Sequence, residues 1–202
     1  MNADFAVNGV IIETERLLLR PFQQSDLQDF YEYASVEGVG EMAGWSHHEN
    51  IQTSQEVLNA FIKEDKTFAI VYKENQKVIG SIGVEKYKNE QSWREFFGYE
   101  GREIGYVLSK AYWGKGIMME AVKAVILHLF RIVGLDFLLC GYYDFNVQSK
   151  RVQEKCGFQP YRKFVIETLM GTKEPCVLNL LVNPYKHVTL EFTDLGTLIY
   201  QE

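Results

Sequence analysis

The stretch that most restricts the fold is residues 102–143, in which two strand-like segments enclose a glycine turn and a long amphipathic helix. The flanking segments read REIGYVL (102–108) and DFLLCGYY (136–143). Between them, apolar residues recur with helical spacing at positions 117, 118, 121, 122, 125, 126, 129 and 130. A strand, a helix and a second strand in this order favour a right-handed parallel crossover. The sequence therefore predicts a mixed α/β fold.

Segments on both sides of this unit also have the periodicity of strands and helices. Ser25 is a candidate N-cap for one helix, and Thr53 with Glu56 has the spacing of a capping box for another. Gly157 follows a short polar helix and is typical of a helix C-terminus. We expect further strands within 11–22, 67–72, 78–87, 162–170 and 175–182, and helices at 25–34, 53–62, 116–132 and 149–155.

The chain length and the lack of linker-like sequence set the expected domain organisation. With 202 residues the chain can build one domain with a sizeable core, whereas two domains would be cramped. No internal repeat or low-complexity segment is visible in the sequence. We expect a single domain over residues 11–185, an N-terminal extension over residues 1–10 and a C-terminal extension of unknown role over residues 186–202.

The composition argues against several classes of protein. A net charge of −6 disfavours broad binding to a nucleic-acid backbone. Cys140, Cys156 and Cys176 are widely spaced and form no CxxC pair, so we expect neither a disulfide framework nor a bound metal. The first ten residues do not resemble a signal peptide, and no apolar run is long enough to span a membrane. These features predict a cytoplasmic protein that binds neither nucleic acid nor membranes.

A short glycine stretch, Gly114-Lys115-Gly116, stands directly between a predicted strand and the long helix. Glycine allows positive φ angles and lets the backbone approach a ligand closely. The first N–H groups of the following helix have no intrahelical partners and lie at the positive end of the helix dipole. Such a terminus can bind phosphate, although two glycines also suit a plain tight turn. The strings GxxxxGK[ST] and GxGxxG are both absent, so neither a Walker-type nor a dinucleotide-binding loop is predicted.

Three segments resemble the GNAT superfamily of N-acetyltransferases, and the resemblance extends over roughly residues 11–185. The segment AYWGKG (111–116) is similar to the acyl-CoA motif [RQ]xxGx[GA], with Ala111 in place of the polar first residue. The segment NVQSKRVQEKCGF (146–158) is similar to the superfamily's Nxx[AS]xxxxxKxGF block. The opening TERLLLRPF (14–22) resembles the branch that includes ribosomal-protein N-terminal acetyltransferases.

This resemblance implies a single-domain GNAT fold, in which a mixed central β-sheet flanked by helices splays apart between its fourth and fifth strands. It also implies that acetyl-CoA is the co-substrate, with its pyrophosphate on the backbone N–H groups of residues 113–118. A backbone N–H near Val107 or Leu108 would stabilise charge on the thioester oxygen. The cofactor-binding residues implied by the resemblance are Tyr106, Val107, Leu108, Trp113, Gly114, Lys115, Gly116, Ile117, Met118, Asn146 and Ser149.

The reaction implied by the resemblance is direct attack of an amine on the thioester, and the attacking amine must be neutral. Glu103, at the start of the implied fourth strand, is the candidate base, with Glu85 or a water path as alternatives. Glu41, His47 and His48 lie in the loop between the first two predicted helices and could also contact the amine. A histidine in a loop is, however, more often simply solvated.

The departing CoA thiolate needs a proton or a hydrogen bond. Many members of the superfamily place a tyrosine four residues after the [AS] position, where this chain has Gln153. Ser149 is therefore the candidate donor to the thiolate, although it could equally bond backbone N–H groups at the start of its helix. Asn146 could bond carbonyl or amide groups of the cofactor.

The predicted activity is transfer of an acetyl group from acetyl-CoA to a primary amine, either a protein N-terminus or a small amine. Ala111 and Gln153, which depart from the superfamily motifs, keep open an alternative: a CoA-binding regulatory module without turnover. The long connection 88–101 could shape the acceptor site or mediate contacts in a homodimer.

Overall fold

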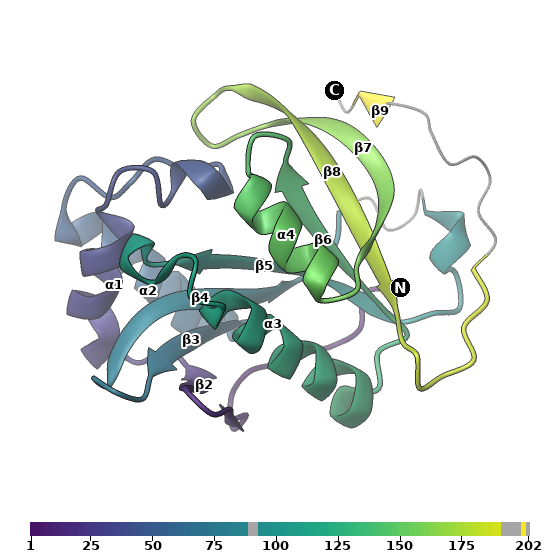
Figure 1. Cartoon of the computed structure of the whole chain (residues 1–202), viewed down its shortest axis with the longest axis horizontal. Coiled ribbons are helices and arrows are strands. Elements are labelled where there is room, and N and C mark those ends of the chain that lie inside the picture. Colours follow the sequence, from purple (N-terminus) through teal and green to yellow (C-terminus); the bar gives the residue numbers. More distant parts are fainter. Residues whose placement is uncertain (89–92, 191–198, 201–202) are drawn as a thin grey trace. The chain divides into compact units, whose positions relative to one another are not determined.

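The computed structural model of the chain describes residues 1–88, 93–190 and 199–200. Its strands form a mixed sheet in the order β1-β2-β3-β4-β5-β6-β8-β7-β9 (Figure 1). The strands are β1 (Ile12–Glu13), β2 (Leu17–Pro21), β3 (Thr67–Tyr72), β4 (Lys77–Glu85), β5 (Gly101–Leu108), β6 (Phe137–Tyr143), β7 (Gln159–Glu167), β8 (Lys173–Val182) and β9 (Ile199–Tyr200). The α-helices are α1 (Leu27–Ala34), α2 (Ile51–Glu64), α3 (Ile117–His128) and α4 (Val147–Lys155). The predicted α/β class is confirmed.

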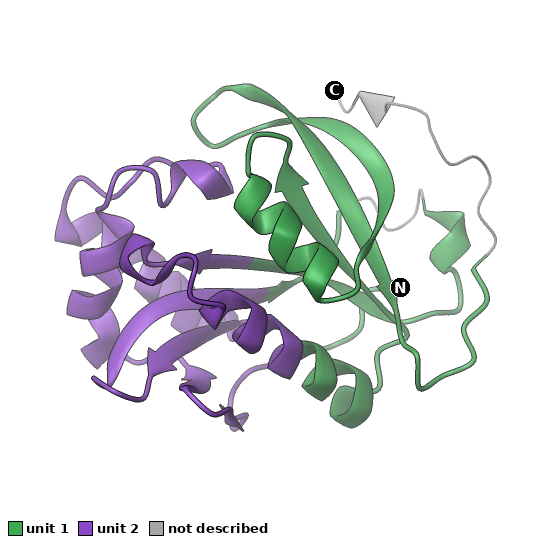
Figure 2. Cartoon of the chain, viewed as in Figure 1, with its two compact units in different colours: residues 1–4, 84–105, 126–202 green, residues 5–83, 106–125 purple. Residues whose placement is uncertain are grey.

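Residue contacts divide this domain into two compact units, which Figure 2 shows in different colours. Unit 1 comprises residues 1–4, 84–105 and 126–202, and unit 2 comprises residues 5–83 and 106–125. The elements β4, β5 and α3 each begin in one unit and end in the other. Within each unit, the described residues include a hydrophobic cluster of its own. Among the described residues, no helix has the length and apolar character needed to cross a bilayer.

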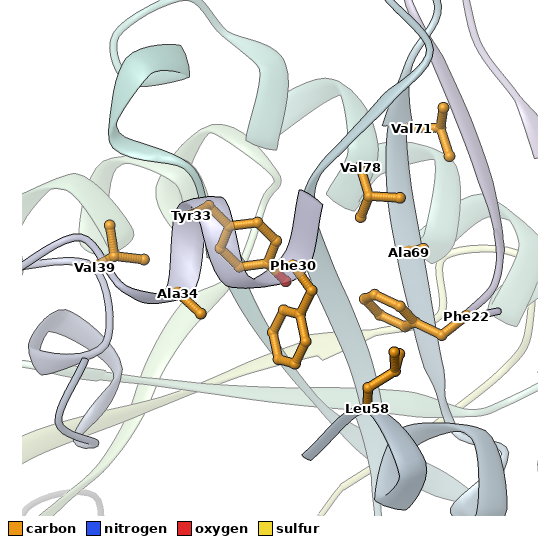
Figure 3. Packing of buried hydrophobic residues seen from close by; sticks show 9 residues of the cluster. All are labelled: Phe22, Phe30, Tyr33, Ala34, Val39, Leu58, Ala69, Val71 and Val78. Atoms are coloured by element: carbon orange, nitrogen blue, oxygen red, sulfur yellow. The ribbon is translucent and has the colours of Figure 1, made fainter. Parts of the chain in front are cut away.

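The hydrophobic cluster of unit 2 forms where α1 and α2 pack on β3 and β4 (Figure 3). The ring centroids of Phe22 and Phe30 lie 5.8 Å apart, and those of Phe30 and Tyr33 lie 5.3 Å apart. Leu58 of α2 is completely buried in the same cluster. The apolar side chains of each helix recur on one face, so their burial fixes which face meets the strands.

The start of α1 differs from the sequence prediction. A 3₁₀ turn, Gln24–Asp26, precedes the helix. Within this turn the Asp26 carboxylate accepts the Gln23 N–H at 2.8 Å and pairs with Arg20 at 2.7 Å. The prediction of Ser25 as N-cap was therefore wrong, because Ser25 lies inside this turn, and Gln23 and Asp26 form its capping box.

The start of α2 also differs from the prediction. The helix begins at Ile51, because the Asn50 side chain accepts the Thr53 N–H at 3.0 Å and so acts as the N-cap. Thr53 and Glu56 therefore lie inside the helix, and the predicted capping box does not mark its start.

The sheet of unit 1 has two differently covered faces, because side chains alternate along β6 and its partner β8. One face meets α4, whose Gln153 is completely buried. The other face carries an aromatic cluster from the connection before β5. Phe96 stacks on Phe137 with 4.1 Å between the ring centroids, and Trp93 stacks on Phe164 at 6.1 Å.

The segments expected as extensions are attached to the units. In unit 1, Asn2 forms a parallel bridge with Gly101, and its side chain exchanges hydrogen bonds of 3.0 and 2.8 Å with the Tyr87 backbone. In unit 2, Val7 is buried. Near the other end, Lys186 pairs with Asp136 at 2.8 Å in unit 1. Residues 191–198 and 201–202 lie outside the described residues, and the domain boundaries 11–185 stay a prediction.

Strand β5 carries much of the expected site, and it pairs with β6 over only part of its length. A parallel register joins residues 101–103 to residues 137–139, so the predicted parallel crossover through α3 is confirmed. In the described part of the chain, this register ends at the pair Glu103–Leu139. β5 nevertheless continues to Leu108. The splay that the resemblance implies beside this strand stays a prediction.

Replacing Leu58 tests whether the helix packing in unit 2 provides the expected stability. Leu58→Ala removes a completely buried side chain, so we expect the free energy of unfolding to fall by about 2–5 kcal/mol. Ile62→Ala on the same helix is the matched control, because Ile62 is 37% exposed. Urea denaturation measures both variants. Equal losses in the two variants would contradict the packing described for α2.

Candidate functional site

The glycine loop joins β5 to α3 through a short 3₁₀ helix, Lys110–Tyr112. Gly114 and Gly116 both have a φ angle of +74°, in the left-handed region that glycine tolerates best. Apart from its two chain neighbours, no described residue has an atom within 4 Å of the position that a Gly114 side chain would occupy. The corresponding position at Gly116 meets the Arg16 guanidinium at 3.7 Å. Both glycines thus adopt the conformation for which the sequence prediction required them.

The loop presents a row of backbone N–H groups. Hydrogen bonds inside helices aside, the described residues provide no acceptor for the N–H groups of Gly114, Lys115 and Gly116. Ile117 and Met118 form the first turn of α3, whose N–H groups have no intrahelical partners. Together with the open space over Gly114, these donors fit an anionic group such as a pyrophosphate.

Arg16 and Glu120 form an ion pair that attaches the β1–β2 connection to the glycine loop. The Arg16 guanidinium donates from Nε and Nη2 to Glu120 Oε2, at 2.7 and 2.6 Å. Its Nη1 donates to the Lys115 carbonyl at 3.0 Å. Thr14 Oγ1 donates to Glu120 Oε1 at 2.6 Å. Burial alone would raise the pKa of Glu120, but the hydrogen bonds from Thr14 and Arg16 lower it, so the carboxylate stays charged.

Sequence reasoning missed this ion pair. Arg16 lies in the TERLLLRPF segment and Glu120 in the first turn of α3, about 100 residues later. Arg16 belongs to a segment that carried the family resemblance and Glu120 follows shortly after another, AYWGKG, but no local pattern connects the two residues. Only the folded chain brings them together.

The end of β5 leads directly into the loop. Leu108 is buried, whereas Tyr106 and Val107 are half-buried. The Trp113 indole N–H donates to the Leu108 carbonyl at 2.8 Å, so the loop folds back on the strand end. The Ser109 N–H donates to a β4 carbonyl at 2.7 Å. These contacts fix the backbone that precedes the glycines, while the roles of Tyr106, Val107 and Leu108 toward a cofactor stay predictions.

The Glu103 carboxyl lies in a desolvated position on the sheet of unit 1. Its Oε1 is 3.8 Å from the point where a Gly141 side chain would begin, and Cys176 Sγ is 3.4 Å from the same point. Burial raises the pKa of Glu103 to about 7, while Lys88 lowers it and Glu85 raises it. A carboxyl group poised near neutral pH suits a general base.

The groups around Glu103 stay protonated near neutral pH. Burial raises the pKa of Cys176 to about 12, and the charge of Glu103 adds to this effect. Burial also raises the pKa of Tyr143, with smaller contributions from Cys176, Glu174 and Glu103. Tyr143 stacks on Phe145, which is 46% exposed, with 5.5 Å between the ring centroids. Among Glu103, Tyr143 and Cys176, only Glu103 therefore titrates near neutral pH.

The start of α4 holds the other predicted site residues in a hydrogen-bond network. Asn146 is the N-cap, and its side-chain carbonyl accepts the Ser149 N–H at 2.9 Å. Gln153 donates to the Gly141 carbonyl at 2.9 Å and to Ser149 Oγ at 3.2 Å, and it accepts from Asn179 at 2.9 Å. Gln153 thus connects α4 to β6 and β8. The side chain that caps the helix is that of Asn146, and the cofactor roles of Asn146 and Ser149 stay predictions.

The loop between α1 and α2 uses its charged residues for its own structure. Glu41 accepts the N–H groups of Gly38 and His47 at 2.7 and 3.0 Å and pairs with the His47 ring at 2.8 Å. Burial alone would raise the pKa of Glu41, but these hydrogen bonds lower it to about 2. The buried His48 ring bonds Ser54 at 2.7 Å. We expected loop histidines to be simply solvated, but both rings form hydrogen bonds within the loop or to the start of α2. Both histidines therefore hold the loop together.

Among the described residues, no three His, Cys, Asp or Glu side chains are grouped so that they could hold a metal ion. In unit 2, the backbone loop is suited to bind an anion such as a phosphate. In unit 1, the Glu103 carboxyl has a raised pKa and can accept a proton, and the start of α4 holds a hydroxyl-amide network.

Comparison with known proteins gives a consistent assignment. The Acetyltransferase (GNAT) domain family matches residues 16–159. An uncharacterized N-acetyltransferase, YnaD of Bacillus subtilis, is 29% identical over 153 residues, covering 73% of this chain and 82% of YnaD. The ribosomal-protein-S5-alanine acetyltransferase of Vibrio fischeri has a similar structure, with a TM-score of 0.68, 22% identity and coverage of 87% of this chain and 97% of that chain.

A further similar structure is the microcin C7 self-immunity acetyltransferase MccE, which was solved in complex with acetyl-CoA and AMP. It superposes with a TM-score of 0.67 and 16% identity, over 84% of this chain and 93% of that chain.

Replacing Gly116 tests whether the glycine loop binds the cofactor. A valine at this position would place a branched side chain at positive φ, against Arg16. We expect Gly116→Val to weaken acetyl-CoA binding at least about tenfold, measured by isothermal titration calorimetry.

The matched control for this variant is Gly9→Val. Gly9 has a similar φ angle of +78° and no atom within 4 Å of its would-be side chain, but it lies outside the loop. It should lose a similar amount of stability and keep its affinity for acetyl-CoA. Unchanged affinity in Gly116→Val would refute the binding role of the loop.

Proposed function

Because the chain belongs to the GNAT acetyltransferase family, we propose that it transfers the acetyl group of acetyl-CoA to a primary amine, either a protein N-terminus or a small amine. The family match over residues 16–159 supports acetyl-CoA as the donor. The position and raised pKa of Glu103 support an amine that has to lose a proton.

The glycine loop supports a specific placement of the donor. The backbone N–H groups of residues 114–118 would bind the pyrophosphate, since Ala111 offers no polar side chain at the first motif position. The Trp113 N–H, also predicted to take part, donates to the Lys110 carbonyl at 3.3 Å instead. Tyr106, Val107 and Leu108 would provide backbone groups to the pantetheine. An N–H near Val107 or Leu108 would donate to the thioester oxygen as negative charge develops on it.

Glu103 would act as the general base. An alkyl amine is mostly protonated at neutral pH, so the amine has to lose a proton before or during attack. With a pKa of about 7, the Glu103 carboxylate can accept this proton directly or through a water molecule. The new bond joins the amine nitrogen to the acetyl carbon, and the carbon–sulfur bond breaks as CoA leaves.

Ser149 would stabilise the leaving thiolate. Its hydroxyl lies at the start of α4, where Gln153 donates to the Ser149 oxygen at 3.2 Å. A serine hydroxyl is a weak acid, so a hydrogen bond to sulfur is the proposed role. The amide of Asn146, at the N-cap of the same helix, would bond polar groups of the cofactor.

The position of Glu103 favours turnover over a CoA-binding module. Burial disfavours the charged form of a carboxyl group and therefore costs stability at neutral pH. A carboxyl group that exchanges its proton near neutral pH suits a general base. The placement of Glu103 on the sheet of unit 1, with its Oε1 near Gly141, is the observation that carries the proposal of turnover, and its raised pKa agrees with this role.

The names of the similar proteins support more than one acceptor. The Vibrio fischeri protein is named for an alanine of ribosomal protein S5, and MccE is named for self-immunity to microcin C7. The proposal therefore includes both protein N-termini and small amines. Cys140, Cys156 and Cys176 form no disulfide, which supports the proposed cytoplasmic location. Sedimentation of the purified chain tests the proposed homodimer.

A thiol-release assay tests the proposed activity. Purified protein is incubated with acetyl-CoA and a panel of peptides with free N-termini, polyamines and other small amines. We expect release of CoA thiol with at least one amine, together with the acetylated product by mass spectrometry. Binding of acetyl-CoA without thiol release across a broad panel would favour the regulatory module instead.

Replacing Glu103 with glutamine tests the proposed base. We expect Glu103→Gln to lower turnover by about 10²–10⁴-fold with little change in acetyl-CoA affinity. In the unchanged protein, turnover should rise with pH through about 7 as Glu103 loses its proton. This rise should be absent in the variant. Glu85→Gln is the matched control, and a larger loss there would assign the base to Glu85.

The same variant has a predicted effect on stability. The folded-state pKa of Glu103, about 7, lies above its ordinary value of 4.5. Its contribution to stability is therefore fully present below pH 4.5 and is lost as the pH rises through about 7. We expect Glu103→Gln to melt at a higher temperature than the unchanged protein at pH 8, with a smaller difference at pH 5. A lower melting temperature at pH 8 would contradict the desolvated position of this carboxyl.

A further inference from the structure

The contact between Arg16 and the glycine loop involves the backbone of the loop. The guanidinium Nη1 donates to the Lys115 carbonyl at 3.0 Å. This carbonyl and the N–H of Gly116 belong to the same peptide group. In a trans peptide the C=O and N–H bonds point in opposite directions. The bond from Arg16 to the carbonyl therefore directs the Gly116 N–H away from Arg16.

Without this contact, the peptide between Lys115 and Gly116 could rotate easily. Glycine populates positive and negative φ angles about equally, so the Gly116 side of the peptide group resists rotation little. Gly114, on the other side of Lys115, also has a positive φ angle and the same conformational freedom. A rotated peptide would present the Lys115 carbonyl where the Gly116 N–H had been. A carbonyl repels a phosphate, whereas an N–H binds it.

Glu120 holds Arg16 in the orientation that this contact needs. Two guanidinium nitrogens bond Glu120 Oε2, at 2.7 and 2.6 Å, and the third bonds the Lys115 carbonyl. Glu120 is itself fixed by the Thr14 hydroxyl at 2.6 Å and by the Arg16 backbone N–H at 3.0 Å. The planar guanidinium can serve both acceptors at once, which the single ammonium of a lysine does far less well.

We propose that Arg16 is a positioning residue for the pyrophosphate of CoA, which holds the Lys115–Gly116 peptide so that the Gly116 N–H is available to the phosphate oxygens. Arg16 thereby contributes to a site in which Ala111 replaces the polar residue of the motif. This role rests on the proposed placement of the pyrophosphate at the glycine loop. It assigns to the β1–β2 connection a part in cofactor binding.

The experiment compares three ligands that differ in their phosphate groups. CoA and dephospho-CoA both contain the pyrophosphate, and dephospho-CoA lacks only the ribose phosphate. Pantetheine lacks both phosphate groups and the adenosine. Binding of the first two is measured by isothermal titration calorimetry, and binding of pantetheine by titration in NMR spectra. These measurements do not depend on knowing the acceptor.

The test variant is Arg16→Lys, which keeps the positive charge, and its matched control is Arg20→Lys. Arg20 also lies in unit 2 and forms a two-point ion pair, with Asp26 at 2.7 Å for both bonds, away from the loop. Glu120→Gln is a second variant, which leaves Arg16 in place but removes the charge that orients it. Circular dichroism establishes that each variant is folded.

We expect Arg16→Lys to weaken binding of CoA and dephospho-CoA about tenfold, because it removes the charge-assisted hydrogen bond from Arg16 to the Lys115 carbonyl. Glu120→Gln should change the same two affinities in the same direction. Pantetheine binding should stay unchanged in both variants, and Arg20→Lys should leave all three affinities unchanged. This pattern is not expected from a general loss of structure.

Two results would overturn the role of Arg16. One is unchanged affinity for CoA in Arg16→Lys and in Glu120→Gln. The other is an equal loss of affinity for pantetheine, which would indicate general damage. If the unchanged protein binds CoA no more tightly than pantetheine, the placement of the pyrophosphate at the loop fails, and the role of Arg16 fails with it. The first two results, by contrast, leave that placement intact.

Discussion

The limited pairing of β5 with β6 is the constraint on which the candidate site depends. Three residues of β5 pair in parallel with β6, and the register ends at Glu103 in the described part of the chain. The strand nevertheless runs on to Leu108 and leads into the glycine loop. One strand therefore carries the proposed base in unit 1 and the approach to the phosphate-binding backbone in unit 2. Changes in the length or register of β5 would alter both.

Glu120 in unit 2 and Glu103 in unit 1 have surroundings that shift their pKa values in opposite directions. At the loop, Arg16 and Thr14 keep Glu120 ionised, so a fixed ion pair supports the backbone. At Glu103, burial acts in the opposite direction and raises the pKa to about 7. The first arrangement favours rigidity, whereas the second keeps a proton exchangeable at neutral pH. A cofactor has to be held in one geometry, while a base has to change its protonation state in each cycle.

Local sequence patterns predicted the elements of the fold well but their ends and long-range contacts less well. The segment 102–143 predicted the crossover because strand and helix periodicities and glycine conformation are properties of neighbouring residues. The N-caps were wrong because several polar residues stand near each helix start, and tertiary packing selects among them. Arg16 and Glu120 were missed because their contact spans about 100 residues of chain. The position of Glu103 at the start of its strand was enough to choose it as the candidate base. Its desolvation could not be predicted, because it comes from residues of β6 and β8.

Direct titration of the Glu103 carboxyl tests the central claim, that this carboxyl is desolvated and titrates near neutral pH, as the proposed base requires. Carbon-13 NMR of protein labelled at glutamate carboxyls can follow this group, and its signal is assigned by its absence from a Glu103→Gln spectrum. The desolvated position predicts a titration midpoint near pH 7. A midpoint near the ordinary value of 4.5 would show a solvated carboxyl and would contradict the claim.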